Sequence, residues 1–230
     1  MAIRYEAAYP KNPDQAATFL RPQYRNLIRE IYRTGHERYE ICQGAEICFA
    51  MEHLLENLSP RSGGFIEIGS AYGGSFHCWA SIIDGPAISV DKINARTIEH
   101  GVSTPSAPGM AETRNRLWEE SFPGRVTAID GYSQEPATLA AVSAALAGRK
   151  VDFVFLDGDH SERITRLDFE NYSKFVRPGG MIGFHDVFYA VHHDQCGKVF
   201  RELPLDKWDT GCHRQTMGLP PNGIGIACIK

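Results

Sequence analysis

Acidic residues and histidines directly follow two apolar runs that are typical of buried strands. They are Asp157, Asp159 and His160 after residues 151–156, and His185 and Asp186 after residues 180–184. Open α/β sheets bind ligands beyond the carboxyl ends of their strands, so these side chains meet at one rim if the two strands are neighbours. Carboxylate oxygens suit Mg²⁺ or Mn²⁺, whereas an added imidazole favours Mn²⁺, Fe²⁺, Co²⁺ or Zn²⁺. The spacing therefore predicts a site that holds a divalent cation or moves a proton.

The segment FIEIGSAYGGSFHCWA combines a buried strand, a glycine-rich turn and the start of a helix. Gly69, Gly73 and Gly74 permit backbone angles that other residues avoid, and they let a ligand approach the main chain closely. The free N–H groups at the start of the helix, from about Ser75, then face that ligand. By itself such a loop is a weak signal, because many tight turns use glycine.

Two acids beside this loop narrow the choice of ligand. Glu67 lies two residues before Gly69, where a carboxylate repels a phosphate but attracts a cationic amino-acid end. Asp91 ends the next apolar run, AISVDK, where it can accept hydrogen bonds from both hydroxyls of a ribose. Each acid alone has an ordinary explanation, as a capping or salt-bridged carboxylate or as a strand-end acid. Their order around the glycine loop favours the ligand-binding interpretation.

The chain resembles class I S-adenosylmethionine (SAM)-dependent methyltransferases over roughly residues 60–190. EIGSAYGGS is similar to their first motif, and SVDK to the acidic end of their second strand. The resemblance implies that the glycine loop binds the methionine part of SAM and that Asp91 binds the ribose. It also implies that the loop AIDGYSQEP lies beside the adenine. The chain departs from the family at Tyr132, because an acid more often stands there and Asp130 is displaced by two positions. The cofactor-binding residues implied in this way are Glu67, Gly69, Ser70, Tyr72, Gly73, Ser75, Asp91, Lys92, Gly131, Tyr132, Ser133 and Asp157.

LDGDH and FHDV are similar to motifs of the metal-dependent O-methyltransferases, a group that includes catechol O-methyltransferase and the enzymes that modify sugars and antibiotics. The resemblance implies transfer of a methyl group to a hydroxyl of a small molecule. It also implies that Asp157, His185 and Asp186 hold Mg²⁺ or another divalent cation. His185 departs from the pattern, because an acid usually stands there. Either the metal differs, or His185 does not bind one and the enzyme works without it.

In this family the general base lies two or three residues past the first acid, which is Asp159 or His160 here. An imidazole titrates near neutral pH, so His160 can take a hydroxyl proton without a large pKa shift, and we rank it first. Asp159 can act as the base, or it can orient His160 or the substrate. The structural alternative is that the acids of this motif only cap the helix after Ser161.

Two other functions stay open. A SAM-binding protein of this fold can catalyse N-methylation, decarboxylation or cyclisation instead. A Rossmann-type NAD enzyme, or a catalytically silent nucleotide-binding protein, is disfavoured by Glu67 in the first motif and by the lack of a clean GxGxxG.

Six short apolar runs indicate the fold class. They lie at residues 64–68, 87–90, 126–129, 151–156, 180–184 and 224–229, and helical or polar segments separate the first five. This alternation predicts an α/β fold: a Rossmann-like, mostly parallel sheet with helices on both faces. A turn at Pro178-Gly179-Gly180 is expected before the fifth strand. No helix follows the last run, so we expect it to insert as an antiparallel strand.

Residues 1–60 are expected to form an arm and helices ahead of a SAM-binding domain at residues 61–230. Apolar side chains recur at helical spacing in residues 24–32 and 47–58, and Ser59-Pro60 is a fitting helix stop. These helices can form a lid, a contact between copies in a homo-oligomer, or a plain cover for one sheet edge.

The composition argues against charged macromolecular partners and against membranes. The net charge of −4, from 24 basic and 28 acidic residues, gives no global field for nucleic acid or anionic membranes. No stretch approaches the ~18 uninterrupted apolar residues that a membrane span needs. The N-terminus lacks the pattern of a signal peptide, so the six scattered cysteines are expected to be reduced thiols in the cytoplasm.

A second cluster of residue types that bind zinc lies near the C-terminus. It comprises His192, His193, Asp194, Cys196, Cys212 and His213. The spacing fits no familiar zinc finger, so a polar substrate loop with unrelated thiols is favoured. In similar enzymes the region that corresponds to residues 188–221 covers the acceptor pocket.

Overall fold

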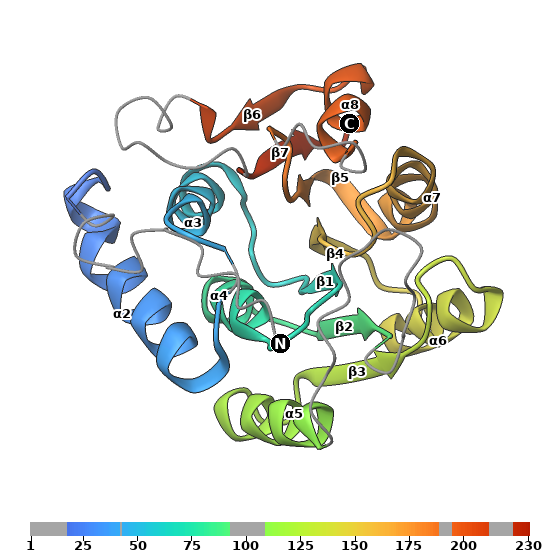
Figure 1. The fold of residues 1–230 in the computed structure, drawn as a ribbon, viewed down its shortest axis with the longest axis horizontal. Helices are drawn as coiled ribbons and strands as arrows, with labels where there is room; N and C mark the ends of the chain where they lie inside the picture. Colours follow the sequence, from blue (N-terminus) through green and yellow to red (C-terminus); the bar gives the residue numbers. More distant parts are fainter. Residues whose placement is uncertain (1–17, 42, 93–108, 189–194, 212–222) are drawn as a thin grey trace, which may run out of the picture.

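The protein folds around one seven-stranded sheet in the order β3-β2-β1-β4-β5-β7-β6 (Figure 1). The computed structural model describes residues 18–41, 43–92, 109–188, 195–211 and 223–230. β1 to β5 are parallel, β7 pairs antiparallel with β5, and β6 pairs antiparallel with β7. The strands are β1 (Phe65–Ile68), β2 (Ala87–Asp91), β3 (Val126–Asp130), β4 (Val151–Leu156), β5 (Val176–Phe184), β6 (Lys207–Asp209) and β7 (Gly225–Cys228).

Helices cover both faces of this sheet, as Figure 1 shows. One face packs against α3 (Glu46–Asn57), α4 (Gly74–Ile82) and α5 (Met110–Ser121), and the other against α6 (Pro136–Leu146), α7 (Glu162–Tyr172) and α8 (Cys196–Glu202). α2 (Pro22–Tyr39) lies over α3 and α4 on the side away from the sheet. A short 3₁₀ turn, η1 (Ser173–Phe175), joins α7 to β5. Because successive side chains of a strand point to opposite faces, a strand such as β1 contributes side chains to both apolar clusters. Phe65 of β1 belongs to the cluster under α2–α5, and Ile66 to the cluster under α6–α8.

The predicted fold class is confirmed, including the antiparallel last strand. Two details differ from the prediction. β5 begins at Val176, and Pro178-Gly179-Gly180 lies inside the strand at a shift of register against β4 instead of forming a separate turn before it. The glycine at 179 adopts a φ of +73°, which bulges commonly require. β6 was not predicted, because three residues are too few for a periodic pattern.

The two expected N-terminal helices form α2 and α3. Ile28, Ile31 and Tyr32 of α2 are buried, and they share one apolar cluster with α3 and α4. Leu27, which follows the same helical stripe, is 48% exposed. None of the helices described in the structure combines the length and the apolar character needed to cross a membrane.

Candidate functional site

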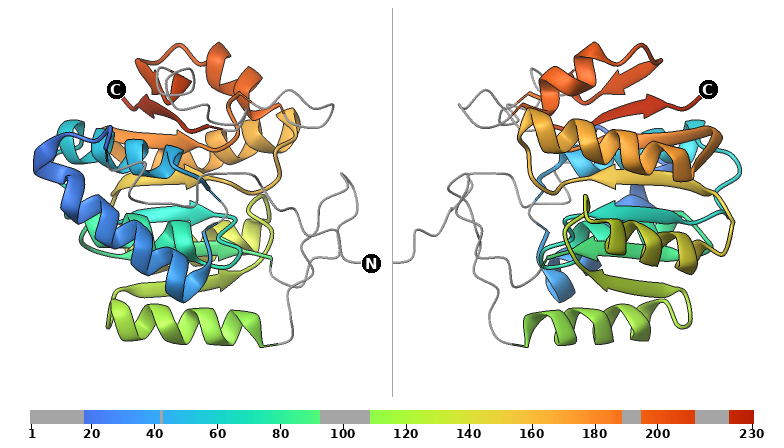
Figure 2. Two further views of the ribbon diagram at one scale, coloured as in Figure 1. Left: turned by 60° about the vertical axis from the view of Figure 1, so that its left-hand side comes forward. Right: turned by 90° about the vertical axis from the view of Figure 1, so that its right-hand side faces the viewer.

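The carboxyl ends of the central strands meet at one edge of the sheet, and Figure 2 shows their arrowheads on the same side. β1 lies between β2 and β4. Ile68 is in register with Leu156, so the chain leaves both strands at the same level, at Gly69 and Asp157. The connections from β1 and β4 run to opposite sides of the sheet, which makes this edge a topological switch point, the usual ligand site of open α/β sheets. The tertiary structure thus brings the glycine loop beside the acidic motif of β4.

The glycine loop packs tightly against its surroundings. Gly69 has a φ of +82°, and a Cβ added there would lie 2.1 Å from the backbone oxygen of Asp157. Gly73 has a φ of +93°, and its Cβ would lie 2.7 Å from the ring of Trp118 in α5. Neither position accepts a side chain without moving β4 or α5. These glycines are therefore needed for the fold of the loop itself, in addition to any contact with a ligand.

Glu67 is a fully buried acid whose carboxylate makes no hydrogen bond in the described part of the chain. Its residue is 0% exposed, and neither carboxylate oxygen has a hydrogen-bond partner among the described residues. Burial raises the pKa of Glu67 to about 8, although the nearby hydroxyls of Ser75 and Ser70 act in the opposite direction. A buried acceptor without a donor is costly. A cationic group that entered the site would satisfy it.

Asp91 ends β2 and pairs with a residue to which the sequence analysis gave no role. Nη1 of Arg114, from α5, donates to Oδ2 of Asp91 at 2.8 Å. Burial raises the pKa of Asp91, and the Arg114 guanidinium acts in the opposite direction. Lys92 turns to the neighbouring strand, where its Nζ lies 3.2 Å from Oδ1 of Asp130. The Asp91 carboxylate at this edge of the sheet is thus already paired with the guanidinium of Arg114.

The other residues of the glycine loop that were predicted to bind the cofactor also lie at this edge of the sheet. The Oγ of Ser70 lies 2.8 Å from the Oγ of Ser89, and both residues are buried. Tyr72 is half-buried. Ser75 is buried in the first turn of α4.

The predicted adenine loop follows β3 and is held by α7. Gly131 is buried, and a Cβ there would meet Oγ1 of Thr138 at 2.2 Å, whereas Tyr132 is 36% exposed. Ser133 donates from Oγ to Oδ1 of Asp168 at 2.7 Å. The next residue along the loop donates to the same oxygen at 3.1 Å. Asp168 was missed by the sequence analysis, because 35 residues separate it from Ser133 and no motif links them.

The acids and histidines that follow β4 and β5 form one cluster. His160 lies between two carboxylates, with Nε2 3.2 Å from Oδ1 of Asp157 and Nδ1 3.2 Å from Oδ2 of Asp186. His185 approaches the same two acids, with Nδ1 2.9 Å from Oδ1 of Asp157 and 3.4 Å from Oδ1 of Asp186. Asp186 has a φ of +56°, a strained conformation for a residue with a side chain and one that often marks functional sites.

The charges in this cluster stabilise one another. Burial alone would raise the pKa of Asp157, but the neighbouring His185 and His160 lower it to about 2. Burial alone would lower the pKa of His185, but Asp157 and Asp186 raise it to about 9. At neutral pH, without any bound cation, His185 is therefore an imidazolium that neutralises these acids.

Two residues of the N-terminal segment reach this cluster, and the sequence analysis missed both. Nε2 of Gln43 donates to Oδ2 of Asp157 at 2.5 Å. Glu46, at the start of α3, is buried, and its Oε1 accepts from the backbone N–H of Gly44 at 2.8 Å. Burial raises the pKa of Glu46, and the charge of His185 acts in the opposite direction. In the sequence Glu46 looks like an ordinary first-turn acid, and nothing links Gln43 to a residue 114 positions away.

Asp159 lies apart from the cluster in the structure. Its residue is exposed, and its Oδ1 accepts from the backbone N–H of Ser161 at 2.8 Å. Ser161 is the N-cap of α7 and accepts from the N–H of Ile164. Ser161 therefore caps α7, Asp159 supports the turn just before it, and Asp157 faces the histidines.

Three side chains form a group that can hold a metal ion within the described residues. The ligand atoms of Asp157, His160 and His185 all lie within 4.8 Å of one another. Nε2 of His185 and Oδ1 of Asp186 are buried without a hydrogen-bond partner among those residues. Of the second predicted cluster, Cys196 alone is described: its Sγ lies 3.3 Å from Oγ1 of Thr165. His192, His193, Asp194, Cys212 and His213 lie outside the described residues.

Comparison with solved structures finds the same fold in several proteins of low sequence identity. Rv0187 from MTB, solved with a bound cofactor, is 18% identical with a TM-score of 0.58, over 89% of this chain and 88% of that one. The O-methyltransferase from Bacillus cereus in complex with SAH is 15% identical with a TM-score of 0.56, over 89% and 91%. MycE from the mycinamycin biosynthetic pathway, in complex with Mg, SAH and mycinamycin VI, is 14% identical with a TM-score of 0.54. The chain aligns over 88% of its own length with MycE but spans only 54% of the MycE chain.

Sequence comparison identifies the family. None of the curated proteins compared with the chain matches it. A family model described as a methyltransferase domain matches residues 66–187, more than half of the chain. The match begins within β1 and ends just after the His185-Asp186 pair, so it contains both the glycine loop and the acid–histidine cluster. The chain therefore belongs to this family of methyltransferases.

Proposed function

We propose that this methyltransferase takes its methyl group from SAM and transfers it to a hydroxyl oxygen of a small molecule. The observation that carries the proposal is the buried, unpartnered carboxylate of Glu67 beside the glycine loop, with the acid–histidine cluster on the adjoining strand ends of the described chain. SAM presents an ammonium group, a ribose and an adenine. The carboxylate of Glu67 on β1 can bind the ammonium group, and the carboxylate of Asp91 on β2 can bind the ribose. The loop after β3 can lie beside the adenine, and the three strands are adjacent in this order in the sheet.

The chemistry requires alignment and removal of one proton. An acceptor oxygen attacks the methyl carbon of SAM, the bond from carbon to sulfur breaks, and S-adenosylhomocysteine (SAH) leaves. The protein has to hold the two reactants in line and take the proton of the hydroxyl. A neutral hydroxyl is a poor nucleophile at pH 7, so the identity of the proton acceptor decides the rate.

His160 is the residue best arranged to accept that proton. Carboxylates lie 3.2 Å from each of its ring nitrogens. A substrate hydroxyl that replaces one of the two carboxylates hydrogen-bonds to the imidazole. The other carboxylate then stabilises the imidazolium as the proton arrives. Asp159 is a weaker candidate, because it is exposed and its Oδ1 accepts from the backbone N–H of Ser161.

The residues present also fit a divalent cation. Asp157, His185 and Asp186 would hold it: Asp157 and His185 belong to the group of close ligand atoms, and Nε2 of His185 has no hydrogen-bond partner among the described residues. Oδ1 of Asp186 lies 3.4 Å from Nδ1 of His185 and adds a buried carboxylate oxygen. Mixed carboxylate and imidazole ligands suit Mn²⁺, Fe²⁺, Co²⁺ or Zn²⁺ as well as Mg²⁺. A bound cation would lower the pKa of the acceptor hydroxyl and fix its position.

Two further predictions lie outside the site. A homo-oligomer formed through the N-terminal helices is supported by the exposed side chains of Phe19 and Leu27, and light scattering would measure the mass in solution. A reducing compartment such as the cytoplasm is supported by the described cysteines, which are free thiols: Cys48, Cys78, Cys196 and Cys228.

The function can be tested by incubating the protein with SAM labelled in its methyl group and a panel of hydroxylated small molecules. We expect SAH to form together with a labelled product, and NMR of that product to show an O-methyl group. A labelled methyl group on nitrogen would show that the acceptor is an amine and not a hydroxyl. Binding of NADH without binding of SAM or SAH would overturn the proposal.

A further inference from the structure

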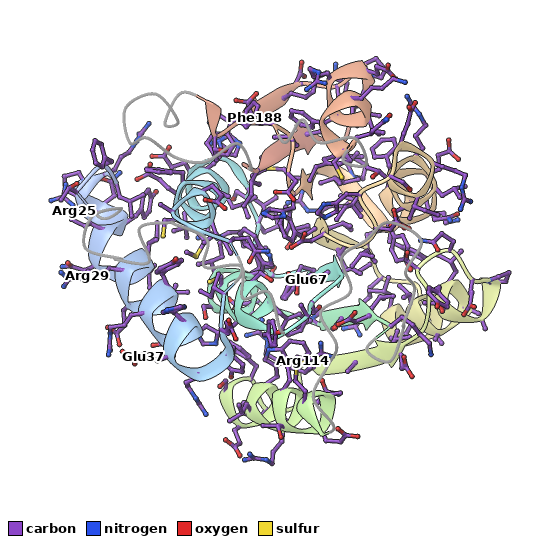
Figure 3. The ribbon with its side chains drawn as sticks, viewed as in Figure 1. Arg25, Arg29, Glu37, Glu67, Arg114 and Phe188 are labelled. Carbon is purple, nitrogen blue, oxygen red and sulfur yellow. The ribbon has the colours of Figure 1, made fainter. Side chains whose placement is uncertain are left out.

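We propose that Arg114 is a positioning residue for cofactor binding, which from α5 holds Asp91 and the glycine loop in the arrangement that receives SAM. This goes one step beyond the proposed function, on which it rests. The cofactor residues implied by the sequence motifs include none from α5. In Figure 3 Arg114 is labelled above α5 and Glu67 on β1, near the centre of the molecule.

One nitrogen of Arg114 joins the two parts of the predicted cofactor site. Its Nη1 donates to the backbone oxygen of Ala71 at 2.7 Å and to Oδ2 of Asp91 at 2.8 Å. Ala71 lies inside the glycine loop and has a φ of +42°, an unfavourable conformation for a residue with a side chain. Such a conformation persists when surrounding contacts hold it in place. Arg114 provides one of these contacts.

The neighbouring Trp118 supports the same arrangement. The Arg114 guanidinium lies 4.5 Å from the centre of the Trp118 ring. The indole N–H of Trp118 donates to the backbone oxygen of Gly73 at 3.1 Å. One turn of α5 therefore makes hydrogen bonds to the loop at both Ala71 and Gly73.

The position of the charge favours the same interpretation. The Arg114 side chain is only 2% exposed, and a buried cation is stable only when acids and acceptors surround it. The acids that sense its charge are Asp91 and Glu67, the two predicted cofactor acids. Asp130 is the other acid that acts on Asp91, and it is itself paired with Lys92. Arg114 is therefore the buried cation that these two acids share.

The shape of the guanidinium matters in addition to its charge. Arg114 donates to two acceptors while it stacks on an indole, and a lysine ammonium reproduces the charge but not the planar stacked group. We expect Arg114→Lys to retain part of the effect. Arg116, on the same helix, provides a matched control, because it is exposed and pairs only with Glu120 on the surface in the described structure.

The test measures the affinity of the purified protein for SAH by calorimetry, with folding checked by circular dichroism. We expect Arg114→Met to weaken SAH binding at least tenfold, Arg114→Lys to weaken it at least threefold, and Arg116→Met to leave it within twofold. In steady-state kinetics, Arg114→Lys should raise KM for SAM and leave kcat at saturating SAM within about threefold.

A double-mutant cycle with Asp91→Asn separates positioning from general support of the fold. If Arg114 acts through Asp91, Arg114→Lys should cost clearly less SAH affinity in the Asp91→Asn background than in the wild type. Equal losses of affinity in the two backgrounds would overturn the inference. So would a folded Arg114→Lys variant that binds SAH with wild-type affinity. If Arg114→Met does not fold, the Arg114→Lys variant decides the question. Failure of the wild type to bind SAH would instead refute the proposed function.

Discussion

Gln43 donates a hydrogen bond to Asp157 across 114 residues of chain, with Nε2 2.5 Å from Oδ2. The contact joins the segment between α2 and α3 to the end of β4. The other oxygen of Asp157 lies near both His160 and His185. The N-terminal segment thus fixes one side of the carboxylate while the histidines take the other, so the acid–histidine cluster depends on a part of the chain outside the matched methyltransferase model.

Gln43→Leu should lower turnover without loss of cofactor affinity. The variant removes a hydrogen bond to a charged group, which typically contributes about 1.5–3 kcal/mol, so kcat should fall about tenfold to a hundredfold. SAH affinity should stay near that of the wild type, because the Gln43 side chain hydrogen-bonds to Asp157 and the predicted contacts with the ribose and the amino-acid end come from other residues. Gln23→Leu, at an exposed position of α2, is the control. Wild-type kinetics in Gln43→Leu would show that the contact is dispensable.

His160→Gln should lower methyl transfer by about 10²–10⁴-fold, the usual contribution of a positioned base. The amide can still hydrogen-bond to one neighbouring carboxylate, so the fold and SAH affinity should be retained. His53→Gln is the control, because His53 stacks on Trp208 away from the cluster. If the variant keeps wild-type turnover across pH, His160 is not the base. Asp159 would then accept the proton, or a bound cation would activate the hydroxyl.

Cofactor binding should release a proton at neutral pH. Burial raises the pKa of Glu67 to about 8, so this acid is mostly protonated in the free protein at pH 7. An ammonium group beside it favours the charged form and lowers its pKa. Affinity for SAH should therefore increase as the pH rises through roughly the neutral range towards the pKa of the free protein. Calorimetry in buffers of different ionisation enthalpy measures the release, and Glu67→Gln should abolish it.

Chelation should abolish activity if a cation takes part. Excess EDTA should remove turnover, and added Mg²⁺ or Mn²⁺ should restore it, because Asp157 and His185 belong to a close group of ligand atoms and Asp186 adds a buried carboxylate oxygen. Asp186→Asn should raise the concentration of Mn²⁺ needed for half-maximal activity. Full activity in EDTA would leave these residues as groups that orient the substrate or move protons.

Asp168→Asn should stabilise the fold at pH 7. Burial raises the pKa of Asp168 to about 6, above the ordinary value of a carboxyl group in the unfolded chain. The folded state therefore binds the proton more tightly, and the wild type loses stability as the pH rises through about 4 to 6. The amide introduced by the substitution would keep an oxygen that can accept from Ser133, as Oδ1 of the acid does, and would carry no charge.

A shift of this size corresponds to at most about 3 kcal/mol. Urea unfolding should therefore show a gain of about 1–3 kcal/mol for Asp168→Asn at pH 7 and little or none at about pH 4, where the acid is protonated in the folded state. An equal effect at both pH values would show that packing, and not the charge of Asp168, controls the difference.

The presence of most strands and the class of the site follow from local sequence, whereas the order of the strands in the sheet does not. Short apolar runs alternate with helical segments, and this rhythm predicted β1–β5, β7 and the two helical layers. The glycine loop with Glu67, and the acid–histidine motifs after β4 and β5, were also visible, because a strand, its turn and the following helix are neighbours in the chain. β6 escaped prediction, since three residues carry no periodicity.

The tertiary structure decided which groups act on these motifs. Gln43 reaches Asp157, Arg114 reaches Asp91, and Ser133 reaches Asp168, over 114, 23 and 35 residues respectively. Each of these pairs is formed by the packing of a helix or loop onto the strand ends, and side-chain hydrogen bonds of this kind leave no periodic pattern in the sequence. The sequence by itself determined which residues stand at the strand ends. Only the packing of α2, α3, α5 and α7 around them determined which carboxylates are buried, which are paired, and which are left to receive a ligand.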